Sequence, residues 1–229
     1  MTELRSDARP PGGFRAVVFD LDGVLVDTMI WWREVRTVFA AGLGRRWTAE
    51  DDAAMHGANT REWRAEMRRR LRLDVSEDDI ENAVIGGLLK RYAMAGAPAI
   101  DGAVEAVRRL SRRYSLAVAS SAPRQVIEAA LRGLGVRDLI GAVRSSDEAG
   151  AGKPAPDVFL LAAGELGVHP ADCLVVEDSL NGVLAARAAG MRVVLIPDAK
   201  VPPATGAREA ATYVLTSLRE LDPDRLVAG

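Results

Sequence analysis

From residue 100 onward, segments with helical spacing of apolar residues alternate with short apolar runs typical of strands. The expected helices cover residues 103–113, 124–133, 157–166 and 180–189, and the expected strands cover 116–119, 140–144, 174–177 and 192–196. A further apolar run at 16–19 predicts one more strand near the start of the chain. Alternation of this kind builds a doubly wound parallel sheet, so the predicted fold class is α/β.

A long segment without strand patterns interrupts this alternation directly after the first strand. Helical spacing appears there at residues 29–43, 58–71 and 77–93. We therefore predict two domains, an α/β core formed by residues 1–28 and 96–229 and an all-helical insert at 29–95. The two connections between them, near Thr28 and at residues 95–97, are expected to act as hinges.

The first predicted strand runs directly into the sequence DLDGVLVDT at residues 20–28. Asp20 and Asp22 therefore stand where a parallel strand ends, which is where α/β sheets carry their functional groups. Two carboxylates at one point repel each other unless a cation lies between them, and a hard cation with oxygen ligands such as Mg²⁺ fits. One such Asp is often only a turn former or a helix cap, but that reading does not account for the pair together with Gly23.

Two later segments supply further charged residues for such a site, one of them basic and the other acidic. The sequence GKPAPDVF at 152–159 places Lys153 directly before a proline, which disfavours helix and leaves its ammonium on a constrained loop. The run LVVEDS at 174–179 is another strand pattern that ends in Glu177 and Asp178. Ser120 and Ser121 follow the strand predicted at 116–119, although two serines after a strand are ordinary loop composition.

Taken in order, these segments resemble the motifs of the haloacid dehalogenase superfamily, in its phosphatase and β-phosphoglucomutase-like branch. The resemblance extends from residue 20 to residue 197. It implies a Rossmann-like core and identifies the helical insert as a cap that closes over the active site. It also implies a Mg²⁺-dependent phosphomonoester hydrolase that acts on a small phosphorylated metabolite.

The resemblance assigns a role to each of these polar residues. Asp20 is the expected nucleophile, which forms an aspartyl-phosphate, and Asp22 is the expected general acid and base. Ser120 and Lys153 are expected to bind the phosphoryl group, with help from Ser121. The implied Mg²⁺ ligands are Asp20, Asp178 and the backbone carbonyl of Asp22, and Glu177 is either a further ligand or a residue behind the ligands.

Other functions remain open at this stage. Sugar-phosphate mutases of this branch carry a histidine at the cap position that here holds Trp32. Hydrolysis is therefore the expected reaction, with a sugar-phosphate mutase as the alternative and a dehalogenase as a weaker one. A non-catalytic module that binds a phosphorylated ligand is disfavoured, because such a module does not need an acid/base pair.

Within the insert, the segment around residues 55–63 is rich in aromatic and polar residues. Arg61, His56 and Trp32 are the candidate substrate contacts, and Arg61 is preferred because a guanidinium can hydrogen-bond an oxygen-rich ligand. For Trp31 and Trp63, packing in the core is as good an explanation as contact with substrate.

Composition excludes several classes of partner. The net charge of −2 gives no broad surface for nucleic acids. The single cysteine, Cys173, cannot form an internal disulfide. No apolar run is long enough to cross a bilayer, and the first residues lack the apolar stretch of a signal peptide. We therefore expect a cytoplasmic protein, a monomer or small homo-oligomer, without nucleic-acid or membrane partners.

Overall fold

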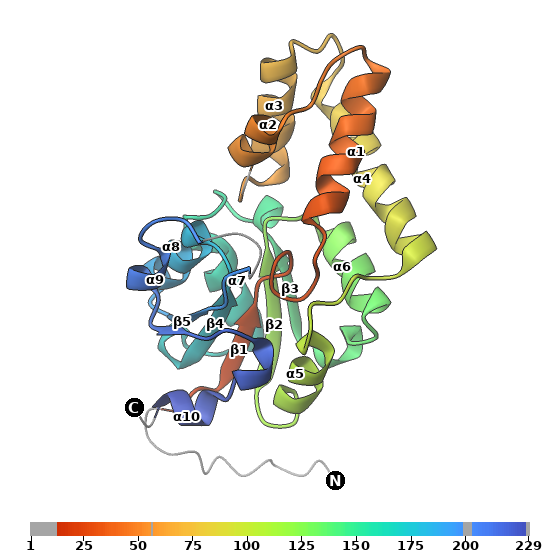
Figure 1. Ribbon diagram of the computed structural model, residues 1–229. Helices are drawn as coiled ribbons and strands as arrows, with labels where there is room; N and C mark the ends of the chain where they lie inside the picture. The colour runs from red at the N-terminus through yellow and green to blue at the C-terminus, as the bar shows by residue number, and fades with distance from the viewer. Residues whose placement is uncertain (1–12, 56, 199–202, 228–229) are drawn as a thin grey trace.

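The computed structural model describes residues 13–55, 57–198 and 203–227. It has an α/β core, with helices α1 to α4 standing together at one end of the core sheet (Figure 1). We call this group of helices the cap. Among the described residues, no helix combines the length and apolarity that crossing a bilayer requires.

The core is a six-stranded sheet in the order β3-β2-β1-β4-β5-β6, and every neighbouring pair of strands is parallel. Its strands are β1 (Ala16–Phe19), β2 (Ser115–Ser120), β3 (Ala142–Ser145), β4 (Cys173–Glu177), β5 (Arg192–Leu195) and β6 (Tyr213–Val214). This order confirms the predicted doubly wound α/β fold. The strand order reverses beside β1, and β1 pairs with both β2 and β4, so the carboxyl ends of these strands meet at one place.

Alternate residues of the strands pack against helices on opposite faces of the sheet. Val17 and Phe19 belong to a cluster with α5 and α6, whereas Ala16 and Val18 pack with α7 and α8. The core helices are α5 (Ala103–Leu110), α6 (Arg124–Gly133), α7 (Asp157–Leu166), α8 (Leu180–Ala188), α9 (Ala207–Ala210) and α10 (Pro223–Val227). Short 3₁₀ turns lie at η1 (Arg137–Leu139), η2 (Ser146–Glu148), η3 (Pro170–Asp172) and η4 (Leu218–Glu220).

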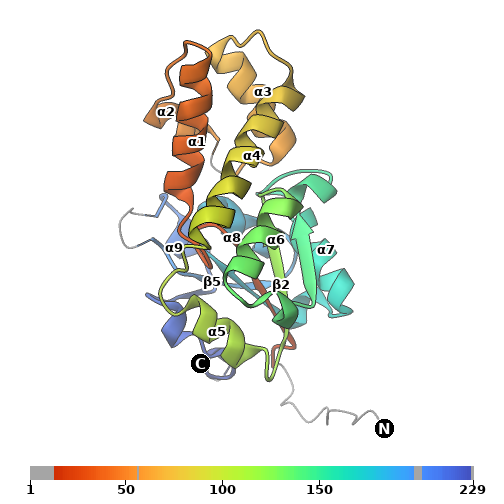
Figure 2. The same cartoon turned by 90° about the vertical axis from the view of Figure 1, so that its right-hand side faces the viewer.

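The cap consists of α1 (Met29–Gly42), α2 (Ala49–Ala54), α3 (Thr60–Leu71) and α4 (Glu77–Ala95). Helices α1 and α4 stand side by side in both views (Figures 1 and 2). Capping boxes begin α2, α3 and α4, because the side chains of Thr48, Asn59 and Ser76 each accept a hydrogen bond from the third residue of the helix. These boxes fix where each helix starts.

The two chain segments that connect core and cap are paired with each other. The Asp27 amide donates to the Pro98 carbonyl at 2.9 Å, and the Ile100 amide donates to the Leu25 carbonyl at 3.1 Å. An antiparallel bridge joins Val26 to Ala99 between these bonds. We call this pair of segments the paired linkers. The domain boundaries predicted beside them, after residue 28 and after residue 95, stay a prediction.

Two further contacts tie the cap to the core beyond the linkers. The Thr60 amide and hydroxyl donate to Asp147 at 2.8 and 2.6 Å. The Ser121 hydroxyl donates to the Gly57 carbonyl at 2.9 Å. The start of α3 therefore rests on the loops that follow β2 and β3.

Candidate active site

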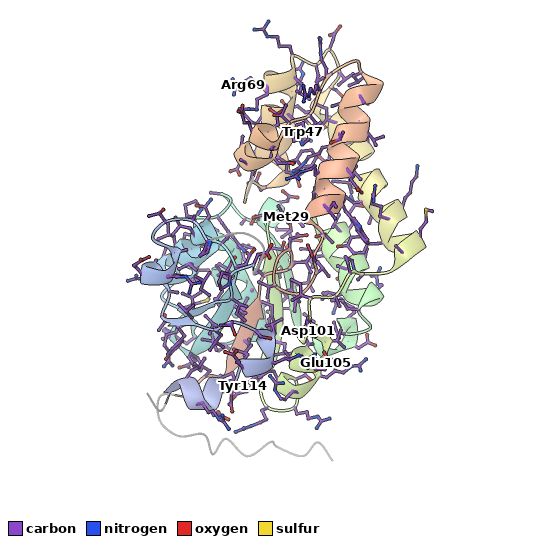
Figure 3. All side chains as sticks on the ribbon, in the orientation of Figure 1. Met29, Trp47, Arg69, Asp101, Glu105 and Tyr114 are labelled. Carbon is purple, nitrogen blue, oxygen red and sulfur yellow. The ribbon has the colours of Figure 1, made fainter. Side chains whose placement is uncertain are left out.

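A pocket of about 100 Å³ lies where the carboxyl ends of β1, β2 and β4 face the cap. The core contributes charged and hydroxyl side chains, and the cap contributes Met29, Trp32, Arg36 and Trp63, among others. Figure 3 labels Met29 at the junction, where α1 leaves the core. The core residues that line the pocket are Asp20, Asp22, Ser120, Ser121, Ala122, Lys153, Glu177, Asp178 and Ser179.

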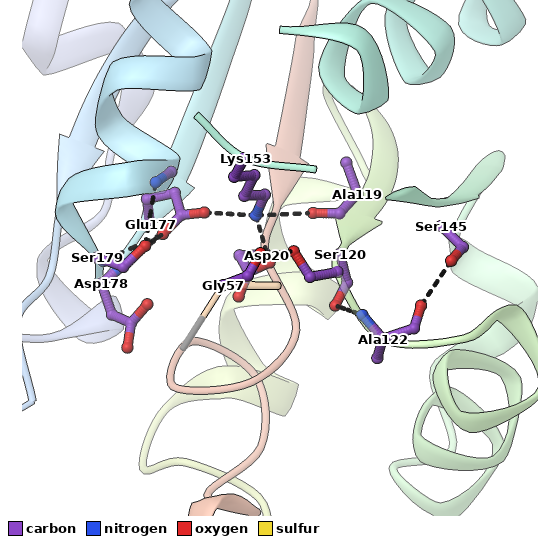
Figure 4. A network of polar contacts seen from close by, with 12 residues as sticks. Asp20, Gly57, Ala119, Ser120, Ala122, Ser145, Lys153, Glu177, Asp178 and Ser179 are labelled. Atoms are coloured by element: carbon purple, nitrogen blue, oxygen red, sulfur yellow. Dashed lines mark hydrogen bonds and ion pairs between the residues drawn. The ribbon is translucent and has the colours of Figure 1, made fainter. Parts of the chain in front are cut away.

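Lys153 connects the ends of three strands. Its Nζ donates to Asp20 Oδ1 at 2.6 Å, to Glu177 Oε1 at 2.5 Å and to the Ala119 carbonyl at 3.3 Å (Figure 4). Burial lowers the pKa of Lys153, but the charges of Asp20 and Glu177 outweigh burial and hold that pKa above its usual value. The lysine is therefore a fixed positive charge in the floor of the pocket.

One lysine does not compensate for all the carboxylates around it. Burial raises the pKa of Asp20 to about 7 despite Lys153, and the charges of Glu177 and Asp22 add to the increase. Burial, with the charges of Glu177 and Asp20, also raises the pKa of Asp178 well above its ordinary value. The cluster is thus short of positive charge, which favours a bound cation.

The same carboxylates have the geometry of a metal site. Oxygen atoms of Asp20, Glu177 and Asp178 all lie within 4.8 Å of one another. Glu177 already uses both oxygens, because Oε1 accepts from Lys153 and Oε2 accepts from the Asp178 amide at 3.0 Å and the Ser179 hydroxyl at 2.9 Å. This favours Asp20 and Asp178 as direct ligands, with Glu177 orienting Lys153 and the start of α8. An all-oxygen site of this kind suits Mg²⁺.

Gly23 allows Asp178 to reach this position. Gly23 has a φ of +87°, and a Cβ built on it would lie 2.1 Å from Asp178 Oδ2. A side chain at residue 23 would therefore displace the carboxylate from the cluster, and the backbone conformation itself disfavours any other residue.

We expect Gly23→Ala to weaken the apparent affinity for Mg²⁺ by about 10- to 100-fold, because Asp178 must move. The measurement is the Mg²⁺ concentration that gives half-maximal turnover, taken together with a thermal melt. Gly44→Ala is the matched control, since Gly44 also has a positive φ but has nothing within 4 Å of the added Cβ. Equal effects of the two substitutions would contradict the role given to Gly23.

Asp22 is held by residues that lead into the cap. Its Oδ1 accepts from the Thr28 hydroxyl and from Trp32 Nε1, the latter at 3.3 Å. Burial raises the pKa of Asp22, although these hydrogen bonds oppose the increase. A carboxyl group with a raised pKa inside the pocket is suited to exchange protons with a substrate.

The two serines after β2 differ in their contacts. Ser120 Oγ is buried and accepts from the Ala122 amide at 3.1 Å, so its own O–H is able to donate into the pocket. The Ser121 hydroxyl donates to Gly57 of the cap, although Ser121 still lines the pocket. The structure therefore favours Ser120 over Ser121 as the hydroxyl donor to a phosphoryl group.

The substrate contact expected of Arg61 is not supported. Arg61 is exposed, donates to the Gly150 carbonyl at 3.4 Å and does not line the pocket that holds Asp20. It lines a separate surface pocket beside Asp147. His56 lies outside the described residues.

Trp32 and Trp63 line the pocket, whereas Trp31 packs edge-on against Tyr92 with ring centroids 5.2 Å apart. Arg36 is one of the pocket residues that the sequence analysis missed, together with Met29 and Asp52 of the cap. Its signal is its spacing, since Arg36 follows Trp32 by one helical turn and precedes the buried Ala40 by another. A charge on the apolar face of an amphipathic helix marks a candidate functional residue.

Comparisons with known proteins identify the family of this chain. The family described as haloacid dehalogenase-like hydrolase matches residues 14–190. A "Probable pseudouridine-5'-phosphatase" of Drosophila melanogaster is 33% identical and covers 91% of each chain. "Hexitol phosphatase B" of Escherichia coli is 31% identical over 82% of this chain and 85% of its own. The crystal structure of CbbY from Rhodobacter sphaeroides in complex with phosphate aligns with a TM-score of 0.82 at 26% identity, covering 94% of this chain and all of that one. The chain therefore belongs to the haloacid dehalogenase-like hydrolases, in their phosphatase branch.

Proposed function

We propose that this phosphatase uses Mg²⁺ and an aspartyl-phosphate intermediate to hydrolyse the phosphomonoester of a small metabolite. The observation that carries the proposal is the position of Asp20. It stands at the end of a central strand, hydrogen-bonded to Lys153 and within reach of Asp178, and Asp22 lines the same pocket. This set supplies a nucleophile, an acid and a cation-binding site within one cavity.

In the first step, a carboxylate oxygen of Asp20 attacks phosphorus and the bond from phosphorus to the ester oxygen breaks. Asp22 donates its proton to that oxygen, so the leaving group departs as an alcohol. Water then attacks phosphorus, with Asp22 accepting the water's proton, and this step regenerates Asp20 and releases inorganic phosphate. Lys153 and Ser120 bind the phosphoryl oxygens throughout.

Asp20, Asp178 and the backbone carbonyl of Asp22 would hold the Mg²⁺. When bound, the ion reduces the repulsion between the Asp20 carboxylate and the phosphate dianion. The protein itself contributes to catalysis in two ways. The buried pocket keeps bulk water away from the phosphate, and it places Lys153 beside the nucleophile Asp20.

The names of the relatives support a sugar-like or nucleoside-like substrate class. One is described as acting on pseudouridine 5'-phosphate and another on hexitol phosphates. Both are phosphomonoesters with several hydroxyl groups. We infer that a hydroxylated phosphomonoester of similar size is the substrate here.

The structure supports hydrolysis over the mutase alternative. The indole of Trp32 donates to Asp22 and has no basic atom with which to accept a proton. Trp32 therefore offers no acid/base group of its own for passing a phosphoryl group between two hydroxyls of one sugar. A mutase would need that group from elsewhere.

Turnover of p-nitrophenyl phosphate is expected to stop when a chelator is added and to return with Mg²⁺, because the carboxylate cluster needs the cation to accept a phosphate dianion. Ca²⁺ is expected to inhibit, since its larger coordination shell misplaces Asp20. Circular dichroism in chelator checks that the fold persists. Turnover without metal would contradict the proposal, and conversion of a hexose 1-phosphate into the 6-phosphate, in place of free phosphate, would establish the mutase instead.

A further inference from the structure

Arg36 is a buried cation in the wall of the pocket. It comes from α1, its side chain is 9% exposed, and it lines the same cavity as Asp20 and Lys153. The phosphoryl chemistry proposed above uses Lys153 and leaves Arg36 without a function. Burying a guanidinium costs free energy, so interactions with its surroundings have to offset that cost.

Three indole rings hold the guanidinium in place. The carbon Cζ of Arg36 lies 4.9 Å from the ring centroid of Trp32, 5.5 Å from that of Trp63 and 5.8 Å from that of Trp47. Trp32 and Trp63 themselves meet edge to face, with centroids 6.3 Å apart. Figure 3 labels Trp47 among the cap helices, away from the sheet. Such contacts stabilise the charge through the ring faces but use none of its N–H donors.

The hydrogen-bonding capacity of Arg36 is left largely unused. Its nearest carboxylate, Asp52, is 4.0 Å away and already accepts from Trp47 Nε1 at 2.8 Å and from Arg33. Arg36 Nε is buried without a hydrogen-bond partner among the described residues. Because a guanidinium carries five N–H donors, an acceptor that enters the pocket would find several of them available.

Trp32 links Arg36 to the chemistry. The indole nitrogen of Trp32 donates to Asp22, and its ring contacts the guanidinium of Arg36. Asp22 is the group that protonates the leaving oxygen in the proposed mechanism. Arg36 therefore lies on the side of the pocket from which the leaving alcohol extends into the cap, and Lys153 and Ser120 lie on the phosphoryl side.

We propose that Arg36 determines substrate specificity by binding an anionic group on the leaving alcohol, either a carboxylate or a second phosphate. This inference rests on the proposed function. Planar bidentate binding of these oxyanions is what a guanidinium does best, and low solvent exposure strengthens the pair. Trp32 and Trp63 pack against the carbon atoms that join the anionic group to the ester oxygen.

The test uses pairs of phosphate esters that differ in one group. Phosphoglycolate is compared with 2-hydroxyethyl phosphate, which replaces the carboxylate by a hydroxymethyl group. Fructose 1,6-bisphosphate is compared with fructose 1-phosphate, which lacks the second phosphate. In at least one pair, we expect kcat/KM of the wild-type enzyme to be at least about tenfold higher for the ester that carries the additional carboxylate or phosphate. We call this ester the anionic member of the pair. The pair that shows the preference identifies which oxyanion is bound.

Arg36→Gln is expected to reduce that preference, the ratio of kcat/KM within the pair, by about tenfold or more. Arg36→Lys, which keeps the charge but loses the fork of donors, is expected to retain part of it. The control is Arg91→Gln, because Arg91 lies in α4 of the cap and pairs with Glu34 at 2.6 Å, outside the pocket. That variant should keep the wild-type ratio.

Two results would overturn the inference. One is a wild-type enzyme that hydrolyses the esters but does not favour the anionic member of either pair, a result that needs no variant to fold. The other is a preference that Arg36→Gln leaves unchanged. Absence of Mg²⁺-dependent turnover on every ester, including p-nitrophenyl phosphate, would instead contradict the proposed function.

Discussion

Replacing Asp20 by asparagine is expected to lower turnover by about 10⁴-fold or more, because the amide cannot attack phosphorus. The substitution changes little volume, and the amide oxygen can still accept the hydrogen bond from Lys153. The folded state should therefore survive. Turnover of p-nitrophenyl phosphate and a thermal melt of the purified variant measure the two effects separately.

Asp172→Asn is the matched control for this variant. Asp172 lies in η3 at the amino end of β4, whereas the pocket lies at the carboxyl end. The same change of charge there should not affect turnover. Full activity of Asp20→Asn would eliminate the covalent mechanism. Loss of activity in both variants would show that the effect is a general response to lost charge.

Lys153→Met is expected to destabilise the protein by about 3–5 kcal/mol at neutral pH and to abolish turnover, because it leaves buried carboxylates without their cation. Asp20 and Glu177 both lose the hydrogen bond from Nζ. The pKa of Asp20, which burial already raises, should then rise further above its unfolded value in the folded state. Under those conditions the folded state binds more protons than the unfolded state, so stability decreases as the pH rises.

The deficit of Lys153→Met relative to wild type should therefore shrink when denaturation is repeated at pH 5 in chelator. Urea denaturation monitored by circular dichroism measures this at both pH values. Lys90→Met serves as the control, because Lys90 is exposed on α4 and its loss should leave stability nearly unchanged. A deficit that grows on acidification would show that the charge of Asp20 does not depend on Lys153 in this way.

Much of the core could be predicted because its signals are local. The strand β1 (Ala16–Phe19) and the helices α6 and α7 begin and end at the predicted residues, since apolar runs there stop at glycine, proline or charged residues. Parallel strands then bring Asp20, Glu177 and Asp178 to one edge without any further information.

Short elements carried too little signal. Helix α2 has six residues, AEDDAA, without an apolar period, and β6 has two residues, so neither was predicted. The capping box that begins at Thr48 could have indicated α2. Predicted helix 103–113 ends at Leu110, because residues 111–114 turn back into β2.

The cap side of the site was harder to predict for a different reason. Helical spacing shows that Trp32 and Arg36 share a face of α1, but it does not show which face of the cap meets the sheet. That depends on contacts between distant segments, such as Thr60 with Asp147 and Ser121 with Gly57. Arg61 was therefore a reasonable candidate from its type alone, and its exposure could be learned only from the fold.

The paired linkers have a mechanical consequence. Because Leu25 to Asp27 and Pro98 to Ile100 are hydrogen-bonded to each other, neither segment can slide along the other without breaking those bonds. Cap movement is thereby confined to bending and twisting of the pair as a single ribbon. Trp32 and Arg36 belong to α1, which continues from this ribbon. When the cap opens, both residues are therefore expected to move away from Asp22 together. An alcohol held by Arg36 would then be drawn away from Asp22 as the cap opens, so opening of the cap and separation of the product from its proton donor would be one event.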